Sequence, residues 1–146
     1  FVIMIVSRYF VMAGVPDMMK EALLNVSDNK YIILLMCNIF MIIIGMLMDD
    51  VSGMLLCTPL LLPVVTAVGV HPIHFAAIIG VNLGMGNITP PTAPLLYIGC
   101  RLTGAPLNKV MKPTLIMLFG AWLPTLLLTT YVPQISLFLP SLFGYV

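Results

Sequence analysis

The segment NLGMGNITPPTAP, residues 82–94, interrupts one of the most apolar regions of this chain. It contains two asparagines, two threonines, two glycines and three prolines. Proline has no backbone N–H, so Pro90 leaves the carbonyl of Gly86 without its helical donor, and Pro91 does the same to Asn87. A residue that precedes proline is also pushed out of the helical region. The segment therefore predicts a break between two half-helices.

The composition of the whole chain indicates the solvent in which this break lies. Of 146 residues, 61% are hydrophobic and 8% are charged, and the mean hydropathy is +1.15. A soluble domain usually carries about 25% charged residues. The sequence therefore predicts an all-α integral membrane protein in contact with the lipid bilayer. A net charge of +1 does not suggest a nucleic-acid partner. Cys37, Cys57 and Cys100 are expected to be free thiols, and no cofactor is expected.

The freed carbonyls suggest a chemical role for the break. In hydrocarbon each unsatisfied backbone group costs several kcal/mol, so such a break is tolerated only where it is buried in protein or lines a polar cavity. The C-terminal end of the first half-helix carries partial negative charge, and oxygen ligands at a helix end suit a small cation. We expect these ligands to come from Gly86, Asn87, Thr89 and Pro90. The second half-helix begins near Pro94, and its positive end favours an anion. The alternative is a kink packed against neighbouring helices, although a kink needs only one proline.

Apolar runs and breakers divide the chain into four parts. Residues 1–30 are expected to hold the end of a transmembrane helix and an amphipathic connector. Residues 31–70 are expected to form a helical hairpin, residues 71–102 a broken transmembrane helix, and residues 103–146 a basic loop, a last transmembrane helix and a tail. The first arm of the hairpin, residues 31–48, would reach ~27 Å at the helical rise, which is nearly a membrane thickness.

The tip of this hairpin carries two acids, whose role depends on its depth in the membrane. The sequence DDVSG, residues 49–53, separates the two apolar arms. If the hairpin is re-entrant, the acids are functional candidates, because a carboxylate at membrane depth costs at least ~2.5 kcal/mol. If each arm is a full span, both acids cap a solvated turn. For the re-entrant case the candidate cation ligands are Asp49, Asp50, Ser52 and Gly53.

Basic residues predict the orientation. Arg101, Lys109 and Lys112 lie in one segment without an acid, which indicates the cytoplasmic side. The turn that contains His71 and His74 is then on the opposite side, and we expect both histidines to be solvated.

Three longer segments resemble a known family. They are GMLMDDVSGMLLCTPLLLPVV at residues 45–65, GVHPIHFAAIIGVNLGMGNITPPTAP at residues 69–94 and YVPQISLFLPSLFG at residues 131–144. Together they resemble the C-terminal third of the large membrane subunit of tripartite ATP-independent periplasmic (TRAP) transporters. The most specific residues are Gly45, Asp49, Pro59, Pro63, Pro72, Phe75, Asn82, Gly86, Thr89, Pro90 and Pro91.

The resemblance implies one half of an inverted-repeat, ion-coupled elevator transporter in the bacterial inner membrane. A sodium gradient would drive uptake of a small organic acid. The implied partners are a periplasmic substrate-binding protein, a small membrane subunit and the remaining N-terminal part of the large subunit. Sodium ligands would fall in residues 49–53 and 86–90. The implied substrate-binding residues are Asn82, Thr92 and Pro94.

Other functions fit the residues less well. A binding-protein-independent sodium/dicarboxylate symporter is the nearest alternative, but it is expected to carry a Ser-Asn-Thr hairpin tip. An intramembrane aspartyl protease needs two acids on separate helices, whereas Asp49 and Asp50 are adjacent. For a purely structural subunit the polar break would have no purpose. The sequence therefore predicts a transporter and not an enzyme.

Overall fold

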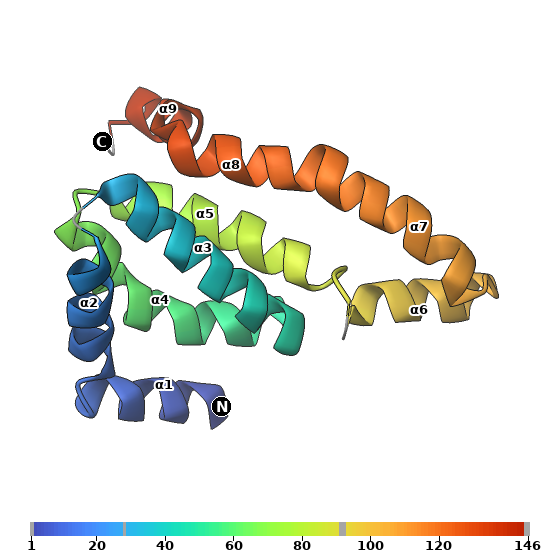
Figure 1. Ribbon diagram of the computed structural model, residues 1–146, viewed down its shortest axis with the longest axis horizontal. Coiled ribbons are helices and arrows are strands. Elements are labelled where there is room, and N and C mark those ends of the chain that lie inside the picture. Colours follow the sequence, from blue (N-terminus) through green and yellow to red (C-terminus); the bar gives the residue numbers. More distant parts are fainter. Residues whose placement is uncertain (1, 28, 91–92, 145–146) are drawn as a thin grey trace.

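The computed structural model describes residues 2–27, 29–90 and 93–144, and every regular element in these ranges is a helix (Figure 1). The predicted all-α fold is confirmed. In chain order the helices are α1 (Val2–Met12), α2 (Val15–Val26), α3 (Lys30–Leu47), α4 (Asp50–Ala67), α5 (Pro72–Gly86), α6 (Pro94–Thr103), α7 (Leu107–Met117), the π-helix η1 (Leu118–Trp122), α8 (Leu123–Tyr131) and α9 (Pro133–Leu142).

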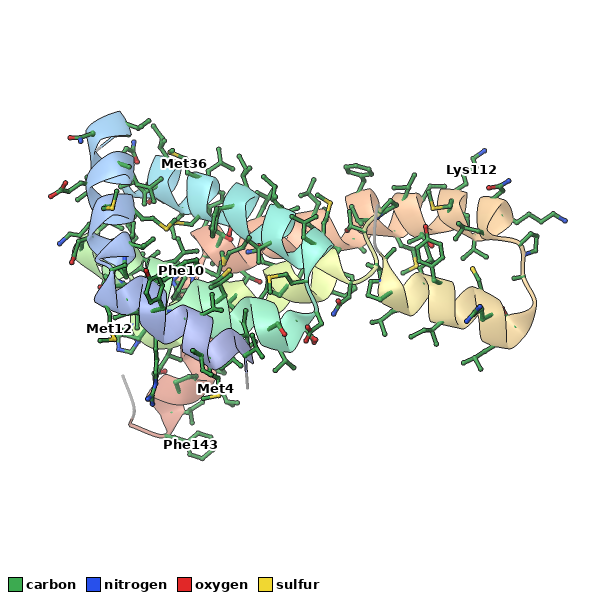
Figure 2. The ribbon with its side chains drawn as sticks, turned by 90° about the horizontal axis from the view of Figure 1, so that it is seen from below. Met4, Phe10, Met12, Met36, Lys112 and Phe143 are labelled. Carbon is green, nitrogen blue, oxygen red and sulfur yellow. The ribbon has the colours of Figure 1, made fainter. Side chains whose placement is uncertain are left out.

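Three of the described helices are long and apolar enough to cross a membrane. They are α3, α4 and the continuous helix Leu107–Tyr131, which α7, η1 and α8 form together. Helices α1 and α2 are bent by 64° relative to each other at Gly14, whose φ is +74°. Side chains that consist mainly of carbon cover much of the outer surface, as expected for helices in contact with lipid (Figure 2).

Helices α3 and α4 form the predicted hairpin, but its turn is shorter than expected. We predicted an interruption at residues 49–53, whereas α4 already begins at Asp50. The reason is that the side chain of Asp49 accepts the backbone N–H of Ser52 at 3.2 Å and caps the helix. Pro59 lies inside α4 without ending it. The hydroxyl of Ser7 on α1 donates to the carbonyl of Leu55 at 3.0 Å, which supplies the donor that Pro59 lacks.

Helix α5 lies at the centre of the packed body, with α3, α4 and α8 around it (Figure 1). Its core side chains include Phe75, Ile78 and Leu83, each at most 1% exposed. Apolar side chains of α3 and α4 complete the same core, among them Ile33 and Val64. The central position of α5 fixes the end of this helix, and with it the start of the break.

Helices α6 and α7 form an arm that extends away from the packed body (Figure 1). We predicted that residues 103–146 begin with a basic loop, whereas α7 begins at Leu107 and contains Lys109 and Lys112. The connecting turn is short because Gly104, with φ of +68°, ends α6 and Pro106 immediately precedes α7. Lys112 lies near the far end of the arm (Figure 2).

One further expectation is wrong. His74 is not solvated: it is 2% exposed, and its Nε2 lies 2.8 Å from the carbonyl oxygen of Thr129, because α8 covers this face of α5. His71 is exposed as expected and caps α5 by accepting the N–H of Ile73. The segment that we expected as a tail contains the helix α9.

Candidate functional site

The end of α3 and the end of α5 meet at two glycines. A Cβ atom placed on Gly86 would lie 2.5 Å from the Cα of Gly45 and would also overlap the carbonyl carbon and oxygen of that residue. Real Cβ atoms do not approach backbone atoms so closely, so only glycine fits at Gly86. The two helix backbones are therefore in direct contact.

The tip of the hairpin rests on the same end of α5. A Cβ placed on Gly53, in the first turn of α4, would lie 3.0 Å from the Cδ2 of Leu83. Leu83 is fully buried and precedes Gly86 by one turn. The structure thus brings Gly53 and Gly86, two of the predicted site residues, to one region of the molecule.

The carbonyls at the break have protein donors, which corrects the expectation that they are unpaired. The carbonyl of Gly86 accepts the N–H of Thr89 at 3.1 Å, and that of Asn87 accepts the N–H of Leu95 at 3.4 Å. The first bond forms because the helix end tightens, and the second because α6 begins close to the end of α5. A carbonyl oxygen has two lone pairs, so each can still coordinate a cation with the second.

Two side chains at the break add further oxygen atoms. The hydroxyl of Thr89 is half-buried and donates to the carbonyl of Met85 at 2.7 Å, so its oxygen lone pairs remain for a cation. Asn87 is 6% exposed. Pro90 is half-buried and directly follows Thr89. The predicted residues of this segment therefore lie together, and their role as cation ligands stays a prediction.

The two acids at the hairpin tip take part in helix capping. Asp49 and Asp50 are exposed, and the side chain of Asp50 accepts the N–H of Val51 at 3.0 Å. Asp49 lies between the two apolar helices, and hydrogen bonds from Ser52 lower the pKa of its carboxyl group. Among the described residues, neither carboxylate hydrogen-bonds to residues 86–90. This is the arrangement that the alternative of a capped turn predicts.

The predicted substrate-binding residues Asn82 and Pro94 differ in burial, and their role stays a prediction. Asn82 is fully buried between helices, and Pro94 is exposed at the start of α6. Thr92 lies outside the described residues. Between them, Ala93 adopts a left-handed conformation with φ of +33°, which costs a non-glycine residue about 1–2 kcal/mol.

Sequence reasoning did not assign a site role to Gly45 or Asn38, which the structure places along the α3–α5 contact. Asn38 had a visible signal, since it is the polar residue inside the apolar run of residues 31–48. The role of Gly45 depends on a contact with a distant helix, which no local pattern reveals.

The family of this chain follows from its comparison with models of known protein families. Residues 2–135 match the family model described as tripartite ATP-independent periplasmic transporter, DctM component. This chain belongs to the DctM family. The family and the apolar helices place it in the bacterial inner membrane, and the named relatives are transporter permeases.

Individual relatives support the DctM assignment. The chain is 39% identical over 132 residues to the uncharacterized protein YgiK of Salmonella typhimurium, covering 90% of this chain and 30% of that protein. It is 40% identical over 124 residues to the isethionate TRAP transporter permease protein DctMQ of Oleidesulfovibrio alaskensis, covering 85% of this chain and 19% of that protein. It is 34% identical over 131 residues to the sialic acid TRAP transporter large permease protein SiaM of Vibrio cholerae, covering 89% of this chain and 30% of that protein. The chain thus spans less than a third of the length of these relatives. No solved structure matches significantly.

A mainly apolar cavity lies beside the break of this DctM chain. It has a volume of about 470 Å³ and lies between α6 and α7, with Ile88, Leu95 and Trp122 among its lining residues. Its walls are mainly apolar, and burying a carboxylate against them would be costly.

Substitution of Asp49 tests its role as a helix cap in the DctM chain. We expect Asp49→Ala to lower the free energy of unfolding through loss of the helix cap, and Asp49→Asn to lower it less, because the amide oxygen can still accept the N–H of Ser52. Because the pKa of this carboxyl is lowered, its contribution to stability is present at neutral pH and is lost as the pH falls through that pKa. Thermal unfolding of the purified permease measures both variants. Equal destabilisation by Ala and Asn would contradict the capping role.

Proposed function

We propose that this chain is the C-terminal part of the large permease subunit of a TRAP transporter that couples sodium entry to the uptake of a small organic acid. The observation that carries the proposal is the contact between Gly45 and Gly86, where two helix ends meet beside a backbone break.

The electrostatics of this contact favour a cation. Helices α3 and α5 both end here, and each helix C-terminus carries about half a negative elementary charge. The N–H of Met48 donates to Ile44 in the last bond of α3, so the carbonyl of Gly45 lies just beyond the helical hydrogen-bond series. We infer that sodium binds between the carbonyls of Gly45 and Gly86 and the hydroxyl of Thr89, with Asn87 and Pro90 beside it.

The start of α6 favours an anion. Helix α6 begins at Pro94, after α5 ends at the proposed site, and its N-terminus carries partial positive charge, which suits the carboxylate of an organic acid. The start of α4 is already occupied by the carboxylates of Asp49 and Asp50. Sodium and substrate would then be coupled, because each orders the segments that the other requires.

The proposed partners follow from the family. We propose that a periplasmic binding protein delivers the substrate and that a small membrane subunit and the rest of the large subunit complete the transporter. The names of three relatives mention isethionate, sialic acid and C4-dicarboxylates, which are all organic acids. The alternative is a sodium/dicarboxylate symporter that works without a binding protein, and the DctM match favours the tripartite form.

Uptake by the complete transporter in liposomes tests the function. We expect uptake of an organic acid only with an inward sodium gradient and only when the binding protein is present. A potassium gradient of the same size, at matched membrane potential, is the control. Equal uptake in both gradients would overturn sodium coupling, and uptake without the binding protein would favour the symporter.

A further inference from the structure

A chain of hydrogen bonds between buried polar side chains joins three helices. The Nδ2 of Asn82 on α5 donates to the Oδ1 of Asn38 on α3 at 2.8 Å, and the Nδ2 of Asn38 donates to the hydroxyl of Thr130 on α8 at 2.9 Å. These side chains are 0%, 3% and 1% exposed. The Nδ2 of Asn82 also donates to the carbonyl of Ile78 at 3.0 Å. We call these three residues the asparagine bridge.

The asparagine bridge is poorly explained by stability alone. Buried interhelical hydrogen bonds in membrane proteins contribute only about 0.6 kcal/mol on average. The bridge also leaves the Oδ1 of Asn82 without a hydrogen-bond partner among the described residues. A buried unsatisfied acceptor costs about 1–3 kcal/mol. An apolar pair of similar volume would fill this place at no greater cost.

The bridge lies in the same helix contact as the proposed sodium site. On α3, Asn38 precedes Gly45 by two helical turns, and on α5, Asn82 precedes Gly86 by one turn. Residues at these spacings lie on one face of a helix. The helix contact therefore holds two cross-helix pairs, Asn38 with Asn82 and Gly45 with Gly86.

Two kinds of contact determine how α3 lies along α5. The glycine pair lets the two backbones approach closely, but it does not fix the position of one helix along the axis of the other. A direct hydrogen bond of 2.8 Å between short side chains does so, because asparagine has few rotamers and the bond is directional. A binding site must hold its ligand atoms within about 0.5 Å of the required geometry.

We propose that Asn38 and Asn82 are positioning residues that set the register of α3 against α5, so that the carbonyls of Gly45 and Gly86 converge on the coupling cation. This inference rests on the proposed function. Thr130 anchors the pair to α8, which adds a third helix to the alignment. Neither asparagine touches the cation, and both act through the position of the helix backbones.

The double variant Asn38→Leu with Asn82→Leu in the complete transporter is the main test. Replacing both partners with apolar groups of similar shape can be nearly neutral for stability, so the melting temperature without sodium is expected to stay close to that of the wild type. The half-saturating sodium concentration for uptake is expected to rise at least fivefold. The stabilisation that sodium gives in thermal unfolding should fall in parallel.

A control variant removes an interhelical hydrogen bond outside the α3–α5 contact. Ser7→Ala breaks the bond between α1 and the carbonyl of Leu55, and we expect it to lower the melting temperature without changing the sodium response. An unchanged half-saturating sodium concentration in the folded double variant would overturn the positioning role.

If the double variant does not fold, Thr130→Val is the variant to test. A rise of about twofold in its half-saturating sodium concentration supports the proposal, and an unchanged concentration overturns it. A wild-type complex that ignores sodium would overturn the proposed function instead.

Discussion

Gly86→Ala is expected to abolish uptake and to lower the free energy of unfolding by about 3 kcal/mol, the upper end of the usual cost of overpacking. The added methyl group would overlap the backbone of Gly45. A flexible side chain could move away from such an overlap, but here α3 itself would have to move. Because both helices belong to the main core, this movement would disturb the core as well as the proposed cation site.

A series of glycine substitutions provides the controls for this prediction. A Cβ on Gly80, also in α5, would meet nothing within 4 Å, so Gly80→Ala should be neutral or slightly stabilising through helix propensity. A Cβ on Gly45 would lie 3.3 Å from the Cα of Gly86, so Gly45→Ala should have an intermediate effect. Melting temperatures and sodium-driven uptake measure all three. If Gly86→Ala were as stable and active as Gly80→Ala, the backbone contact would not exist.

The parts of the fold that depend on local chemistry could be predicted from the sequence. The break after Gly86 follows from the missing N–H groups of adjacent prolines, which is a property of the covalent chain. The length of α3 follows from an apolar run that contains Asn38 but no helix breaker, and the structure confirms a helix over residues 30–47. The second half-helix begins at Pro94, as the position of this proline predicts.

Features that depend on neighbouring helices could not be predicted in this way. The burial of His74 results from α8, which packs over α5 although it lies far away in sequence. The contact between Gly45 and Gly86 likewise needs the packing of two separate helices. The start of α4 was missed for a different reason, because the sequence alone left open whether Asp49 caps a helix or faces the membrane interior.

The same distinction applies to the chemistry of the site: residue types could be recognised from the sequence, but their hydrogen-bond partners could not. Oxygen-rich residues at a helix break could be recognised from residue types, and Thr89 and Asn87 do lie together at the end of α5. Whether the carbonyl of Asn87 was already paired could not be recognised, because the N–H of Leu95 comes from the following half-helix. A cation at this carbonyl would therefore bind through the second lone pair of an oxygen that already accepts a hydrogen bond.

Thr89→Val is expected to raise the half-saturating sodium concentration for uptake at least tenfold, which corresponds to about 1.4 kcal/mol of binding free energy. Valine has nearly the shape of threonine but lacks the hydroxyl oxygen that would coordinate the cation. The variant also loses the hydrogen bond to the carbonyl of Met85. Thr89→Ser keeps the hydroxyl and should retain most of the sodium response.

Thr114→Val is the matched control, because it separates the loss of a helix hydrogen bond from the loss of a ligand. The hydroxyl of Thr114 is also partly buried and donates to the carbonyl of Val110 at 2.8 Å, four residues earlier, but it lies on α7 and not among the proposed cation ligands. Both valine variants should therefore change the melting temperature without sodium by similar, small amounts. Only Thr89→Val should reduce the stabilisation that sodium provides in thermal unfolding. If the two variants responded to sodium equally, the hydroxyl of Thr89 would have a structural role alone, and the coupling cation would have to bind through the backbone carbonyls without it.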